Sequence, residues 1–181
     1  MQAPIQKDNK KKPFRLRDGV RIFALALVAA FLLTQFVVNS TLVEGSSMAN
    51  TLHSGDRLIV FKLGSRIDQL TRGDIVVFRA PEEEKFYIKR VIAFPNEFVQ
   101  IEDGLVYING LRLEESYIST SYTHTSGPKE WYLHEGEVFV LGDNRQKGAS
   151  RDSRVFGPIQ ANRIEGHAVF RYFPLDQMGG L

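Results

Sequence analysis

The stretch FYIKRVIAFP, residues 86–95, indicates the fold class of this chain. Its aromatic and β-branched residues favour an extended strand, and the turn-forming residue Asn96 follows the final proline. Successive side chains of a strand point to opposite faces, so Lys89 shares a face with Tyr87 and Val91. A lysine flanked in this way by apolar groups is a candidate buried amine, and burial would lower its pKa.

Other short stretches have the same strand composition, and turn-forming residues separate them. Asp103-Gly104 and Asn109-Gly110 favour hairpins because both residue types tolerate positive φ. Residues 114–136 are rich in Ser and Thr and predict a surface excursion. We therefore predict an all-β domain over residues 41–181, an antiparallel barrel-like or sandwich fold. The further strands are predicted at residues 58–61, 75–78, 98–101, 105–108, 138–141 and 167–173.

The first 40 residues have a different composition. Residues 22–38 are apolar except for Thr34 and Gln35, and at about 1.5 Å per residue they approach the length that crosses a bilayer. Lysine and arginine crowd the segment before them, which predicts a cytoplasmic N-terminus. We predict a basic cytoplasmic tail over residues 1–20, a single transmembrane helix over 21–40 and an extracytoplasmic domain beyond it. A cleavable signal peptide and a buried core helix are the alternatives.

Composition excludes several classes of site. The chain has 181 residues, a formal net charge of +2 and no cysteine. The absence of cysteine rules out thiol nucleophiles, thiolate metal sites and disulfides. The near-balanced charge gives no support for binding to nucleic acid, and no H-E-x-x-H motif predicts a metal site.

Ser47, in the stretch EGSSMANTL at residues 44–52, is a candidate nucleophile. Most serines in such a stretch only form turns, so a base must be found. Lys89 can serve if burial keeps its amine neutral, although a lysine in a strand more often lies at the surface and blocks edge pairing. A Ser-His-Asp triad stays open because its members meet only in space.

Four segments in order resemble the bacterial type I signal peptidase family, which are membrane-bound serine endopeptidases. Residues 47–52 (SMANTL) are similar to the S-M-x-P-T-L box of the family, and residues 72–78 (RGDIVVF) match its next segment. Residues 89–97 (KRVIAFPNE) are similar to the lysine box, and residues 142–154 (GDNRQKGASRDSR) to the Gly-Asp-Asn box.

The resemblance implies that Ser47 attacks the scissile carbonyl, that Lys89 is the general base, and that Ser150 hydrogen-bonds the lysine amine. It implies removal of signal peptides from exported preproteins at the outer face of the cytoplasmic membrane, after small residues at positions −3 and −1. It implies no cofactor and no metal, and preproteins and the lipid bilayer as partners. Supporting residues would be the ion pair Asp152–Arg154 with Asp143 and Asn144, and the nucleophile and oxyanion loop would comprise Gly45, Ser47 and Met48.

Three positions depart from the family pattern. Asn50 replaces a proline, which predicts a softer loop. Residues 146–149 make the last box two residues longer and affect the placement of Ser150. Gly45 stands where part of the family has a serine, so the oxyanion would depend mainly on backbone N–H groups. Two alternatives remain: a non-catalytic relative that binds exported chains, and a peptidase dedicated to one substrate such as a pilin or a conjugation protein.

Overall fold

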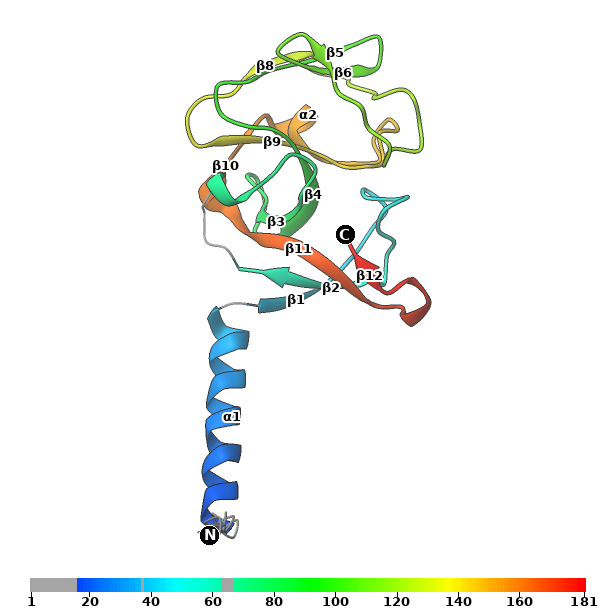
Figure 1. The fold of residues 1–181 in the computed structure, drawn as a ribbon. Helices are drawn as coiled ribbons and strands as arrows, with labels where there is room; N and C mark the ends of the chain where they lie inside the picture. Colours follow the sequence, from blue (N-terminus) through cyan, green and yellow to red (C-terminus); the bar gives the residue numbers. More distant parts are fainter. Residues whose placement is uncertain (1–15, 37, 63–66) are drawn as a thin grey trace, which may run out of the picture. The chain divides into compact units, whose positions relative to one another are not determined.

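The computed structural model describes residues 16–36, 38–62 and 67–181. The chain divides into two compact units, Met1–Phe36 and Val37–Leu181. The first contains helix α1 (Leu16–Phe36), and β1 (Val38–Leu42) begins the second (Figure 1). Residues 38–40, expected at the end of the anchor, therefore belong to the sheet. Among the helices of the described residues, none has the combined length and hydropathy to span a membrane.

The larger sheet of the second unit has eight antiparallel strands in the order β1-β2-β11-β3-β4-β9-β10, with β12 also paired to β11 (Figure 1). The long strand β11 lies between β2 and β3, although it comes near the end of the chain. The strands after β1 are β2 (Arg57–Phe61), β3 (Ile75–Arg79), β4 (Phe86–Ala93), β9 (Glu137–Leu141), β10 (Ile159–Gln160), β11 (Ile164–Phe173) and β12 (Gly179–Gly180).

The smaller sheet has four antiparallel strands in the order β7-β6-β5-β8. They are β5 (Phe98–Glu102), β6 (Leu105–Ile108), β7 (Leu111–Arg112) and β8 (Glu130–Tyr132). The second unit also contains the short helices η1 (Ile67–Gln69), α2 (Ser153–Phe156), η2 (Ala161–Arg163) and η3 (Leu175–Gln177).

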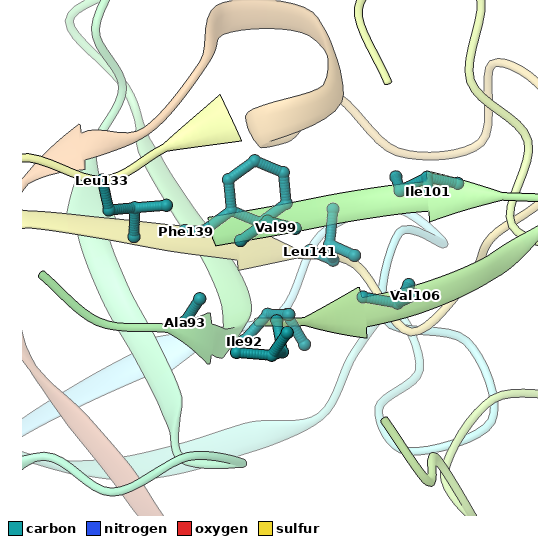
Figure 2. Close-up of a cluster of buried hydrophobic side chains, with 9 residues drawn as sticks. Ile92, Ala93, Val99, Ile101, Val106, Leu133, Phe139 and Leu141 are labelled. Atoms are coloured by element: carbon teal, nitrogen blue, oxygen red, sulfur yellow. The ribbon is translucent and has the colours of Figure 1, made fainter. Parts of the chain in front are cut away.

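Buried side chains join the two sheets. Figure 2 shows Ile92 of β4, Val99 of β5 and Phe139 of β9 in one apolar cluster, and each is 0% exposed. Burying such a side chain contributes about 1.5–3 kcal/mol. A second cluster packs Met48 and Leu52 of the candidate nucleophile segment against the sheet. The first cluster therefore fixes the backbone of β4, and the second fixes the backbone of the candidate nucleophile segment.

The seven strands predicted from sequence are present, and the second unit is mainly β-sheet. The predicted excursion at residues 114–136 needs correction, because β8 lies inside it and pairs with β5. Leu133, in the same segment, is 0% exposed and belongs to the cluster of Figure 2. Its apolar side chain holds the segment to the core.

Candidate active site

The loop between β1 and β2 presents Ser47. Hydrogen bonds from Ala49 N to Ser46 O (3.0 Å) and from Leu52 N to Met48 O (2.8 Å) turn the chain tightly here. Met48 and Leu52 are 2% and 0% exposed. Both apolar side chains are anchored in the core. The backbone of the adjacent Ser47 is therefore held in one position.

Lys89 approaches Ser47 from β4. Its Nζ donates to Ser47 Oγ at 2.7 Å and to the Ile88 carbonyl at 2.8 Å. Nζ also lies 5.3 Å from the centre of the Tyr87 ring. Lys89 is only 3% exposed. It is therefore buried and is not a surface lysine that blocks edge pairing. The alternation of side chains along the strand predicted that Tyr87 and Val91 flank Lys89 on one face. The fold brings the Ser47 hydroxyl to the Lys89 amine.

The surroundings of Lys89 favour its neutral form. Burial is the main cause and lowers the pKa of Lys89 from 10.5 to about 8. The charge of Asp152 opposes this shift, that of Arg154 adds to it, and that of Asp143 opposes it. Part of the Lys89 amine is therefore unprotonated near neutral pH and is able to accept a proton.

The segment after β9 holds the Ser47 loop in place. Asn144 donates from its backbone N–H to the Ser47 carbonyl (3.0 Å) and from Nδ2 to the Ser46 carbonyl (3.1 Å). Asp143 accepts a hydrogen bond from Thr51 Oγ1, at the other end of the same loop. The two neighbouring residues thus hold the loop at both ends.

Asp152 and Arg154 form the expected ion pair, with Nη2 2.7 Å from Oδ2, and Asp152 also accepts from Gly142 N–H at 2.9 Å. Burial raises the pKa of Asp152, but the hydrogen bond and charge of Arg154 outweigh it and hold that pKa below 3.8. Arg154 N–H groups reach the carbonyls of His124 and Arg145 as well. The pair therefore ties the segment to the rest of the domain.

The expected hydrogen bond from Ser150 to the lysine amine is not formed. Ser150 Oγ is buried and makes no hydrogen bond to any other described residue. It lies beside Gly142, where an added Cβ would collide with both Ser150 Oγ and the Ser47 carbonyl. The lysine amine donates to the Ile88 carbonyl and to Ser47 instead.

The departures at Asn50 and Gly45 have a conformational basis. Asn50 has φ +89° and Gly45 has φ +86°. Proline holds φ near −65° and cannot adopt this loop conformation, whereas asparagine tolerates positive φ better than most residues. Asn50 is therefore fitted to its own loop, which corrects the interpretation that it merely softens a proline turn.

Sequence reasoning missed the ionic partners of the site. Arg90 and Thr51 both contact Asp143. Arg145 is 0% exposed and pairs with Glu115, which lies in the predicted excursion. The signal for Arg90 was its place beside Lys89, with a side chain on the opposite face of the strand. No sequence signal marked Glu115.

A cleft of about 330 Å³ opens beside Ser47 and Lys89. Its lining includes residues 41–44, which contain the end of edge strand β1, and residues 86–89 of β4. β9 pairs with β4 only from Arg90 onward, so the preceding part of β4 lacks a strand on that edge among the described residues. No group of metal-binding side chains occurs in the described part of the chain, and no histidine lines the cleft.

Comparison with known proteins adds independent information. A family model described as signal peptidase, peptidase S26, matches residues 16–173. Signal peptidase I of Bacillus licheniformis is 38% identical over 181 residues, 94% of each chain. Signal peptidase I T of Bacillus subtilis is 38% identical over 184 residues, 96% of this chain and 93% of the relative. A crystal structure of a signal peptidase I from Enterococcus faecalis is 33% identical, covers 56% of this chain and 98% of that chain, and has a TM-score of 0.49.

Proposed function

The chain belongs to the signal peptidase family, peptidase S26, and we propose that its Ser47 and Lys89 perform the hydrolysis as nucleophile and general base. It is a serine endopeptidase with signal peptidase I activity. The 2.7 Å contact between Lys89 Nζ and Ser47 Oγ carries the assignment of roles. That distance lies within the range over which a base removes a hydroxyl proton.

The first half-reaction needs a neutral amine. The Lys89 lone pair accepts the Ser47 hydroxyl proton while Oγ attacks the scissile carbonyl. The tetrahedral intermediate collapses to an ester on Ser47, and the ammonium returns its proton to the departing amine. Water then attacks the ester, with the same amine as base, and releases the signal peptide with Ser47 restored. Backbone N–H groups of the loop, including that of Ser47, would stabilise the oxyanion.

Strand addition explains how an unfolded segment can occupy the cleft. Extended peptides bind sheet edges through main-chain hydrogen bonds. Residues 41–44 and 86–89 line the cleft, and among the described residues no further strand pairs with β1 beyond β2 or with residues 86–89 beyond β3. We propose that the preprotein lies extended between them, with small residues at −3 and −1. This mode is independent of most of the substrate sequence, as a signal peptidase requires.

We propose that the enzyme acts at the outer face of the cytoplasmic membrane and is attached to it by the apolar segment that precedes β1. The apolar run of residues 22–38 and the basic residues before it support this location. Protease added outside cells with permeabilised outer layers would digest the domain. A domain that survives this treatment would contradict the orientation.

The test of the mechanism is cleavage of a purified preprotein with an Ala-x-Ala site in detergent micelles. We expect wild type to cut after the second alanine, and Ser47→Ala and Lys89→Met to be inactive while they melt cooperatively. A Lys89→Met variant that still cuts would exclude the lysine as base. Wild-type protein that binds several preproteins and cuts none would identify a non-catalytic relative.

A further inference from the structure

Arg151 is a charged residue of the cleft wall that the hydrolysis does not use. Its neighbours Ser150 and Asp152 are 7% and 0% exposed, so the backbone here is fixed. The Arg151 side chain is 49% exposed and lines the same cleft as Ser47 and Lys89. A rigid backbone thus presents a solvated cation next to the reacting groups.

Acidic residues contact the Arg151 guanidinium but leave it half exposed to solvent. Arg151 forms an ion pair with Glu82 and lies 3.9 Å from Glu83, both on the loop between β3 and β4. Glu82 and Glu83 are themselves 51% and 33% exposed. A guanidinium has five N–H donors, so one that is half exposed can donate hydrogen bonds to an incoming carboxylate.

The cleft is electrically asymmetric. Arg151 and Lys89 are the basic residues among its lining, and Glu44 is the acidic one. Lys89 is buried and has its pKa lowered to about 8 by burial, whereas an arginine is permanently charged. A substrate carboxylate could therefore pair with Arg151 if it displaces Glu82 and Glu83 from the guanidinium, whereas Glu44 would repel it.

We propose that Arg151 is a specificity-determining residue, which binds an acidic side chain of the preprotein close to the scissile bond. This inference rests on the proposed function, since it concerns the substrate of the same cleft. The carboxylate exchanges with Glu82 and Glu83 as the partner of the guanidinium. An exposed ion pair between Arg151 and the substrate would raise kcat/KM by about two- to fivefold. The enzyme would therefore prefer an acidic side chain but would not require one.

The experiment uses preproteins that differ at a single position flanking the cut, with Asp, Asn or Lys, each position being tested in turn. We expect wild type to give a kcat/KM ratio of Asp to Asn of about two to five at one position. Arg151→Gln should bring this ratio to about one, and Arg151→Glu should favour Lys instead. The preference should weaken with added salt. Arg112→Gln, which removes another exposed arginine outside the cleft, is the matched control and should retain the wild-type ratio.

A ratio that is the same in wild type and Arg151→Gln at every position would overturn the proposal. So would an equal loss of preference in Arg112→Gln, because the effect would then be one of overall charge. Failure of wild type to cut the Asn substrates would contradict the proposed function itself. Normal cleavage of the Asn substrates without any charge preference would contradict only the role of Arg151.

Discussion

Arg90 donates two hydrogen bonds to Asp143, from Nε to Oδ1 at 2.9 Å and from Nη2 to Oδ2 at 2.6 Å. The side chains are 10% and 0% exposed. Since Arg90 follows Lys89 and Asp143 also contacts Thr51, this ion pair fixes the strand of the base against the loop of the nucleophile.

Asp143→Asn should destabilise the domain by about 3–5 kcal/mol, because it leaves Arg90 buried without a counter-charge. The free energy of unfolding in urea measures this effect. The control is Glu114→Gln, whose partner Arg112 is 3.7 Å away and whose own side chain is 85% exposed; we expect a change below about 1 kcal/mol. Equal small effects in both variants would show that the buried pair contributes little.

The rate of hydrolysis should fall as pH is lowered through about 8, the pKa to which burial brings Lys89. Protonation removes the lone pair that accepts the serine proton, so kcat/KM should decline about tenfold per pH unit below that value. A pH series on one preprotein in micelles gives the profile. A flat profile from acidic to neutral pH would be incompatible with a lysine base.

The same group should reduce stability at neutral pH. The folded pKa of Lys89, about 8, lies below the ordinary 10.5, so the unfolded chain binds more protons between these values. Stability therefore rises with pH across this window, by up to about 3 kcal/mol, and this contribution is absent below it. Lys89→Met removes the effect, so the stability difference between the variant and wild type should shrink from pH 8 to pH 10.5. A difference constant with pH would argue that the amine is not buried.

Asn50→Pro should destabilise the loop by more than about 1 kcal/mol and reduce kcat/KM, although it restores the family residue. The reason is the φ of +89°, which the proline ring forbids. Asn50→Gly is the matched control, since glycine adopts this conformation freely and should retain activity. Thermal melting and preprotein cleavage test both variants. A fully active, more stable proline variant would refute this loop conformation.

Gly142→Ala should nearly abolish cleavage. Its Cβ would overlap Ser150 Oγ and the backbone carbonyl of Ser47, and so would displace the nucleophile. Gly179→Ala adds the same methyl group where no atom lies within 4 Å, and it should leave activity and stability almost unchanged. If Gly142→Ala cuts at the rate of Gly179→Ala, the packing behind Ser47 is looser than described.

Local sequence signals predicted the strands that are rich in β-branched and aromatic residues, such as β3 and β4. They failed for β1, because Val38 continues the apolar run of the helix, and for β8, whose three residues lie in a polar segment. The Ser47–Lys89 approach was an expectation from the residue types and the family resemblance. The backbone at Asn50 and the ion pairs of Arg90 and Arg145 depend on segments far apart in the chain, so no local pattern reveals them.

The central position of β11 has a consequence for the assembly of the candidate active site. Ser47 lies on the β1–β2 side of this strand and Lys89 on the β3–β4 side, yet β11 ends only at Phe173. Because β11 pairs with both β2 and β3, the hydrogen-bonded sheet between the two halves is complete only when β11 is in place. A polypeptide that lacks β11 would therefore lose the strand that joins the serine side of the sheet to the lysine side. Proteolytic competence would thus depend on a strand that lies far along the chain from both the serine and the lysine.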